Sequence, residues 1–416
     1  MLCAIISLLC CPVWLFKGKA WRRVREFEEN PRTMSLKDLI YFAYKYYHKP
    51  PLKPSSDEVY EIFREMPHNV PFQALATVSI GGDLMPYELI KPETTAHLWD
   101  EVGPDFFGSD IVFANLETTM DLVRNSSFVP EVMLSDMHFN TDETTFSIFS
   151  GSGKYKGYDV LGLANNHSLD MGEEGLENTV KYLRGKGIGA VGARLGPGEK
   201  NYVIREAGGI KVGFIAYTYS LNQFIPPADK PWLVNYLPLN TEDCDISPLT
   251  QTVKQCRENG AELVICSLHC GNAYQAYPSI QTVNLFKRVF AGCGADVIAG
   301  GHPHNLQPWA YHTFTDPMTQ KQKQGFMIFS LADFIAYDIF TWCHLCAYLK
   351  LEIGRDASGQ VVFRAIVNPL VMSREKGQLK LSYAKNTLNG DDLSPERRDL
   401  RILCDLCLAP GKRERA

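Results

Sequence analysis

A cluster of polar residues, Asn165, Asn166 and His167, directly follows the apolar run YDVLGL in the stretch LANNHSLDMGEEGL. A short apolar run is typical of a buried strand, and ligands in α/β proteins sit beyond the carboxyl ends of such strands. Amides and an imidazole at that point can bind a cation or transfer a proton. Other apolar runs also end in polar residues, which are Asp83, Glu117, His269, His302 and His304.

These residues have the chemistry of a metal site. Carboxylate, amide and imidazole groups together suit Mn²⁺, Fe or Zn²⁺, whereas structural zinc sites are richer in cysteine. The chain has 10 histidines, and four of them lie at the ends of apolar runs. One such histidine is more often a capping or surface residue than a ligand. Several at the same end of successive strands are hard to explain as separate accidents, so the joint pattern predicts a metal centre.

The elements that would position these residues alternate along the chain. Apolar, β-rich runs alternate with amphipathic stretches from Phe72 onward, which predicts an α/β architecture. After Cys343 the runs become longer and have no helices between them, as expected of antiparallel strands that join a sheet. The predicted strands cover 73–80, 110–117, 158–166, 211–220, 262–269, 295–302, 326–334, 346–353 and 360–372, and the predicted helices cover 173–187, 246–260 and 280–292.

The motifs at these strand ends resemble the CapA family of capsule-synthesis proteins. That family is associated with poly-γ-glutamate synthesis and belongs to the calcineurin-like metallophosphoesterase superfamily. The resemblance runs in the family's order from about Thr77 to Phe334. It implies an α/β fold, namely a metallophosphoesterase-like four-layer α/β/β/α sandwich with two packed mixed β-sheets. The motifs that carry it are GGD, NLE, ANNHSLDMGEEG, a strand ending in HCG, GGHPHNLQ and FSLADF.

The resemblance also implies a role for each strand-end residue. Glu117 would bridge two metals, and His167 would face the substrate, where it protonates the leaving oxygen or stabilises charge on a phosphoryl group. The cofactor would be one or two divalent first-row ions, Mn, Fe or Zn. Asp83 and His304 would bind one ion, and Asn166, His269 and His302 the other. Asn165, Arg194, Tyr274 and Asp333 are candidate substrate-binding residues, and Asp170, Gly172 and Gly175 are interpreted as turn and helix-start residues.

The chain departs from the family pattern at several positions. Met85 stands where the superfamily has a histidine ligand, and Ala273 replaces the acid of an H-x-G-x-E-Y motif. Asp333 supplies either an extra carboxylate or only a turn, and Arg194 either contacts an anionic substrate or lies on the surface. Two functions therefore remain open. One is a metal-dependent hydrolase acting on a phosphate or related ester. The other is a non-catalytic, membrane-associated accessory protein for making or exporting an anionic polymer such as poly-γ-glutamate.

Composition and charge limit the partners. The chain has 416 residues, of which 45% are hydrophobic, and a net charge of −5, which argues against a nucleic-acid binder. We expect an anionic small-molecule or polymer substrate. Three segments are predicted: residues 1–70 as an apolar anchor and helical lead-in, residues 71–385 as the CapA-like domain, and residues 386–416 as a charged tail.

Localisation is predicted from the N-terminus and the cysteines. The apolar run MLCAIISLLCCPVWLF is followed by basic residues, lacks a cleavage site and is shorter than the roughly 20 residues that span a bilayer. It is either an interfacial anchor or a helix packed on the domain, and we expect residues 1–25 to contact a membrane surface. Scattered cysteines in apolar runs indicate a reducing compartment. The two C-x-x-C pairs, Cys343/Cys346 and Cys404/Cys407, are interpreted as coincidence. Together these features predict a membrane-associated, cytoplasm-facing protein.

Overall fold

The computed structural model describes residues 42–46, 50–54, 56–131, 137–390 and 393–410. An eight-stranded sheet contains β1 at its centre, with parallel strands on one side and antiparallel strands on the other. The strand order is β14-β13-β12-β1-β2-β3-β4, and β11 also pairs with β1. These strands are β1 (Gln73–Leu84), β2 (Ile111–Leu116), β3 (Val160–Gly162), β4 (Gly189–Val191), β11 (Asp333–Ile335), β12 (Leu345–Arg355), β13 (Val361–Glu375) and β14 (Gln378–Tyr383).

A second sheet of six strands has the order β5-β6-β7-β8-β10-β9 and is also mixed. Its inner strands are parallel, and its two outer pairs are antiparallel. The inner strand β7 is an almost unbroken apolar run, as expected of a parallel strand covered on both faces. The six strands are β5 (Val203–Ala207), β6 (Ile210–Thr218), β7 (Leu263–His269), β8 (Val297–Gly301), β9 (Gln307–Thr315) and β10 (Gln322–Ser330).

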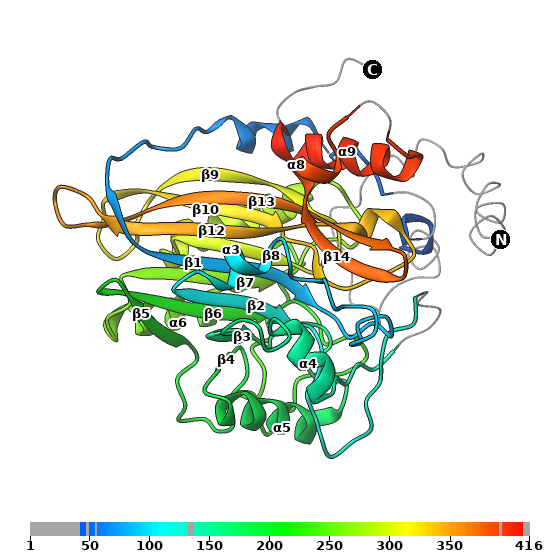
Figure 1. The fold of residues 1–416 in the computed structure, drawn as a ribbon. Helices are drawn as coiled ribbons and strands as arrows, with labels where there is room; N and C mark the ends of the chain where they lie inside the picture. The colour runs from blue at the N-terminus through cyan, green and yellow to red at the C-terminus, as the bar shows by residue number, and fades with distance from the viewer. Residues whose placement is uncertain (1–41, 47–49, 55, 132–136, 391–392, 411–416) are drawn as a thin grey trace, which may run out of the picture.

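The two sheets pack face to face, as Figure 1 shows. The Phe113 ring on β2 stacks on the Phe214 ring on β6, with 5.5 Å between their centroids. Helices α6 and α7 pack against the second sheet, and α5 packs against β4 (Figure 1). The predicted α/β class with two packed mixed sheets is therefore confirmed. The helices of this region are α3 (Gly103–Phe107), α4 (Glu143–Phe149), α5 (Gly172–Gly185), α6 (Ser247–Glu258) and α7 (Ile280–Cys293).

Strand register brings the predicted polar residues to one end of both sheets. Asp83 on β1 is in register with Asn115 on β2 and with Asp333 on β11. On the second sheet, His269 at the end of β7 is in register with Gly301 at the end of β8. The strands concerned are parallel, so their carboxyl ends lie together.

The C-terminal segment differs from the expected charged tail. Residues Pro395–Leu408 form helix α9, and Ser394 caps its N-terminus with a hydroxyl that accepts a hydrogen bond from the Arg397 amide. Leu403 and Cys407 are buried, and α9 packs against β9 and against the 3-10 turn η2 (Thr341–His344). The exposed side of α9 mixes charged residues with Ile402 and Leu408, so its short buried apolar stripe is not apparent from composition alone. Helix α8 (Ala384–Thr387) precedes it.

The predicted membrane anchor, residues 1–25, lies outside the described residues. Of the lead-in before β1, the structure describes residues 42–46, which are helical, residues 50–54, and residues 56–72, which include the 3-10 helix η1 (Asp57–Arg64). Within the described ranges, no helix has both the length and the apolar character needed to cross a bilayer.

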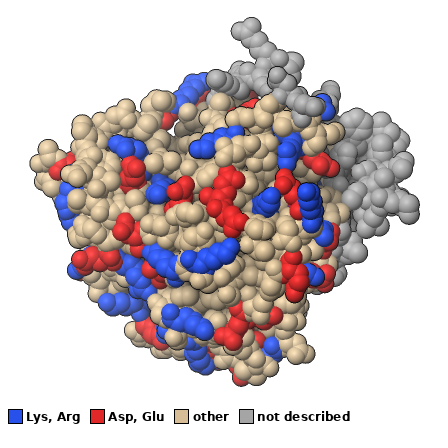
Figure 2. All heavy atoms as spheres, viewed as in Figure 1, with Lys and Arg blue, Asp and Glu red and all other residues tan. Residues whose placement is uncertain are grey.

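The visible surface is mixed in charge, and the described cysteines are unpaired. Figure 2 shows Lys and Arg interspersed with Asp and Glu on the visible face. The described cysteines are free and buried, and they include both C-x-x-C pairs.

Candidate metal centre

The Asn-Asn-His segment forms a tight turn directly after β3. The Ser168 hydroxyl accepts from the Asn165 amide at 2.9 Å and donates to the Leu163 carbonyl at 2.6 Å. The Asn165 side-chain oxygen accepts from the His167 amide at 3.1 Å. Short polar side chains that bond to nearby backbone in this way stop a strand and fix a turn. This turn therefore places the Asn166 and His167 side chains beyond the end of the sheet.

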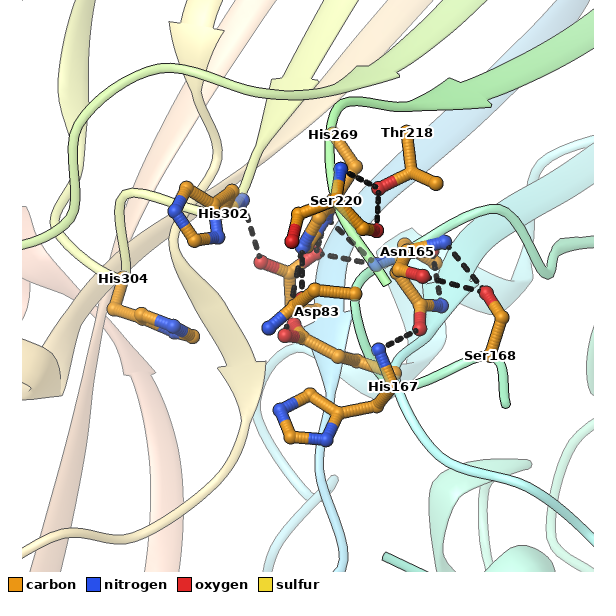
Figure 3. Close-up of polar contacts among 12 residues, drawn as sticks. Asp83, Asn165, His167, Ser168, Thr218, Ser220, His269, His302 and His304 are labelled. Carbon is orange, nitrogen blue, oxygen red and sulfur yellow. Dashed lines mark hydrogen bonds and ion pairs between the residues drawn. The ribbon is translucent and has the colours of Figure 1, made fainter. Parts of the chain in front are cut away.

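One group of candidate ligands consists of Asp83, Glu117 and His304. One ligand atom from each lies within 4.8 Å of the others, and all three side chains are buried. Asn115 donates to Asp83 Oδ1 at 2.8 Å, and the His302 amide donates to Asp83 Oδ2 at 3.2 Å. Asp83 is therefore held in one orientation. Figure 3 shows the histidines arranged around it.

The second group consists of Asn166, His269 and His302. His269 Nε2 lies 2.7 Å from Asn166 Oδ1 and 3.5 Å from Glu117 Oε1. The His302 ring lies 5.2 Å from the His269 ring, centroid to centroid, and its Nε2 bonds to the Tyr219 hydroxyl at 3.0 Å. Glu117 therefore lies between the two groups, where the resemblance put the bridging carboxylate.

Glu117 provides the test of whether a cation fits. Its side chain is fully buried, and no described residue donates a hydrogen bond to Oε1 or Oε2. A buried carboxylate without a partner is costly in free energy, because it has lost its hydration and has no hydrogen bond in its place. Burial raises the pKa of Glu117, and burial together with the Glu117 charge raises the pKa of Asp83 to about 7. A divalent cation would give Glu117 the partner it lacks and would offset the charge of both carboxylates, so the residues fit a metal ion.

The imidazoles differ in charge because their surroundings differ. Burial lowers the pKa of His269 to about 3, so its ring is neutral and able to act as a ligand. Burial also disfavours a charged His304, but the Asp333 carboxylate, 2.7 Å from its Nδ1, together with Glu117 and Asp83 raises its pKa to about 10. Asp333 thus orients His304, as carboxylates behind metal-binding histidines do.

His167 forms a dyad with Asp170 that was not predicted from the sequence. Its Nδ1 lies 2.7 Å from Asp170 Oδ2, and its ring stacks on Phe139 with 3.8 Å between centroids. Asp170 also accepts from the Phe139 amide at 2.6 Å, so the carboxylate is fixed. Burial opposes a charge on His167, yet the Asp170 carboxylate raises its pKa. We expected Asp170 to be a turn residue; its spacing of three residues from His167 was the available signal.

Strained backbone surrounds the site. Positive φ angles occur at His302 (92°), His304 (58°), Tyr274 (55°) and Ala332 (62°). Residues other than glycine rarely adopt this backbone conformation, and such residues cluster at functional sites. Gly301 has a different constraint, since a Cβ there would lie 2.9 Å from Asp83 Oδ1 and 3.1 Å from His269 Nδ1. A side chain at this position would displace two candidate ligands.

A family comparison matches the part of the chain that contains this site. The family model described as "Bacterial capsule synthesis protein PGA_cap" matches residues 77–338. The chain belongs to this family. All six candidate ligands of this PGA_cap member lie within the matched residues.

Two curated relatives carry related descriptions. A "Capsule biosynthesis protein CapA" from Bacillus anthracis is 27% identical over 269 residues, which cover 62% of this chain and 59% of that protein. A "PGA biosynthesis protein CapA" from Bacillus subtilis (strain 168) is 23% identical over 291 residues, covering 68% of this chain and 69% of that protein. The matched region therefore spans about three fifths of the first relative and about two thirds of the second.

Solved structures resemble the PGA_cap member more weakly. The calcineurin-like phosphoesterase YfkN from Bacillus subtilis covers 73% of this chain and 93% of its own, at 16% identity and a TM-score of 0.39. The sulfate thiohydrolase SoxB from Thermus thermophilus covers 82% and 62%, at 12% identity and a TM-score of 0.39. A hypothetical protein from Thermus thermophilus covers 70% and 99%, at 14% identity and a TM-score of 0.38. Because these scores are low, the fold is taken from its own two sheets.

The candidate substrate-binding residues of this PGA_cap member occupy different places. Asn165 donates to Asn115 Oδ1 at 3.2 Å and to the Leu116 carbonyl at 2.8 Å, so it braces the strand ends. Tyr274 stacks on His304 with 5.4 Å between ring centroids. The Arg194 guanidinium donates to the Glu199 carbonyl at 3.2 Å, and burial lowers its pKa.

The described part of the lead-in also packs beside the candidate metal centre of this family member. The Phe42 and Tyr46 rings contact the Tyr274 ring, with centroid distances of 5.4 Å and 4.9 Å. The Tyr46 hydroxyl donates to Asp338 Oδ2 at 2.6 Å, and the buried Lys45 ammonium donates to the Ala273 carbonyl at 2.6 Å. Sequence reading missed these contacts, because they join segments more than 200 residues apart.

Proposed function

We propose that this chain is a metal-dependent hydrolase that acts on a phosphate or a related ester. The observation that carries the proposal is the buried Glu117 carboxylate, whose two oxygens lack hydrogen bonds among the described residues and lie beside imidazole, amide and carboxylate donors. Oxygen and nitrogen donors of this kind suit Mn²⁺, Fe or Zn²⁺. The His167–Asp170 dyad beside them adds a group able to transfer a proton.

In this proposal the chain's own residues position and protonate the substrate. Divalent cations, when bound by Asp83, Glu117 and the neighbouring donors, supply Lewis-acid polarisation of the ester. His167 keeps its ring orientation because Nδ1 bonds to Asp170 and the ring stacks on Phe139. Its Nε2 then donates a proton to the departing oxygen. Burial of the donors keeps bulk water from competing for them.

A second candidate is a non-catalytic accessory role in making or exporting an anionic polymer. The absence of a histidine at Met85 and of the acid at Ala273 favours it, since both losses weaken a catalytic site. The curated relatives are described as capsule and PGA biosynthesis proteins, which supports a polymer context without naming a reaction. In this role the chain would bind an anionic polymer and turn over no ester.

Metal content and turnover distinguish the two candidates. Purified protein should contain about one to two first-row metal ions per chain, and the double variant His302→Ala/Asn166→Ala should lose most of them, because it removes two candidate ligands. With added Mn²⁺ the wild type should hydrolyse an aryl phosphate ester faster than His167→Ala. Metal binding without turnover above that background would favour the accessory role, and wild type that binds no metal would refute the hydrolase.

A further inference from the structure

The amide of Asn166 can serve a cation only in one of its two orientations. Its Oδ1 has lone pairs that can bind a metal, whereas its Nδ2 carries two hydrogens and cannot. Rotation by half a turn about the last side-chain bond would exchange these atoms at the site. Here Oδ1 points to His269, since it lies 2.7 Å from His269 Nε2. Some contact at Nδ2 must favour this orientation.

Asn222 makes that contact. Asn166 Nδ2 donates to Asn222 Oδ1 at 3.1 Å. Asn222 lies in the loop after β6 and has a φ of 52°, a left-handed conformation that asparagine tolerates better than most residues. The backbone N–H of Asn222 donates to the Ser220 hydroxyl oxygen at 3.0 Å, which fixes the loop. The strand end therefore presents an acceptor to the far side of a candidate metal ligand.

We propose that Asn222 is a positioning residue for the metal centre, because its side-chain oxygen holds the Asn166 amide with Oδ1 toward the cation. This inference rests on the proposed function, since it needs a bound metal. Residues that bond to the outer side of a metal ligand affect affinity by about 10- to 100-fold when they are replaced. Asp170 and Asp333 orient imidazoles. Asn222 instead selects which of the two amide atoms of Asn166, the oxygen or the nitrogen, faces the cation.

Two variants separate this role from loop shape. Asn222→Gly removes the acceptor and still allows the positive φ, because glycine adopts that conformation freely. Asn222→Asp keeps an oxygen acceptor at the same position. With Mn²⁺ as the probe, titration calorimetry should give an affinity for Asn222→Gly that is about 10-fold or more below wild type. Asn222→Asp should bind Mn²⁺ at least as tightly as wild type.

A double variant supplies the matched control. In an Asn166→Ala background, adding Asn222→Gly should cause no further loss of affinity, because the amide it orients is gone. Equal Mn²⁺ affinity of Asn222→Gly and wild type would overturn the inference and leave the proposed function standing. A loss in both Asn222→Gly and Asn222→Asp would assign the effect to the loop and also overturn it. Wild type that binds no Mn²⁺ would refute the proposed function and this inference together.

Discussion

Glu117→Gln should abolish the stabilisation of the protein by Mn²⁺ and make the metal-free protein more stable than metal-free wild type. The glutamine keeps the shape of the side chain but removes a buried charge that accepts no hydrogen bond from the described residues. Wild type should gain about 2.7 kcal/mol of unfolding free energy when Mn²⁺ is present at 100 times its dissociation constant. Thermal unfolding of both proteins, with and without Mn²⁺, measures the two effects. Ester hydrolysis should fall with the metal content.

Asp296→Asn is a suitable control, because Asp296 is a buried carboxylate that already has partners. It accepts from the Val264 amide at 2.7 Å and pairs with the Arg257 and Lys323 side chains. This variant should lose stability with and without Mn²⁺, while its shift on adding Mn²⁺ stays equal to that of wild type. If Glu117→Gln also keeps the full Mn²⁺ shift, Glu117 is not a ligand.

His167→Gln should reduce ester hydrolysis by about 10²- to 10⁴-fold, the usual contribution of a positioned acid or base. The metal content should not change, because His167 bonds to Asp170 and Phe139 stacks on its ring, and neither is a candidate ligand. Asp170→Asn should cause a smaller loss, since the imidazole remains but loses the carboxylate that orients it. Steady-state rates and metal analysis on the same protein samples measure both.

The double variant His167→Gln/Asp170→Asn tests whether the two residues act as a unit. Residues of one catalytic unit are strongly non-additive, so the double variant should be no slower than His167→Gln alone. Additive losses would instead mean that Asp170 acts separately from His167. If His167→Gln hydrolyses the ester at the wild-type rate, the histidine has no role in proton transfer.

The sequence predicted the parts of the site that depend on strand ends. Apolar runs followed by Asp83, His269 or Asn166 can be recognised in one dimension, and parallel pairing then brings them together. Sequence position alone does not show which nitrogen or oxygen faces which neighbour. The bond between Asn166 and Asn222 crosses 56 residues and arises in a loop with no regular pattern.

Elements with mixed polarity were missed for a related reason. Strand β9 carries polar residues along much of its length, and β4 is only three residues long, so neither has a clear apolar period. Helix α9 buries only four residues of its charged sequence. Contacts of the Tyr46 side chain with Tyr274 and Asp338 join residues more than 200 positions apart in the sequence, which local patterns do not encode.

The position of β12 bears on how far the family match can be separated from the rest of the chain. The matched residues end at 338, yet β12 begins at Leu345 and pairs along β1 from Gln73 to Ile80. A protein trimmed to residues 77–338 would leave the backbone of β1 from Thr77 to Ile80 without its β12 partner, although β11 would still pair with β1 at Asp83 and Leu84. Unpaired backbone of that kind invites self-association between molecules. We therefore expect the matched part to stay soluble only when the three strands after it, β12, β13 and β14, cover this edge.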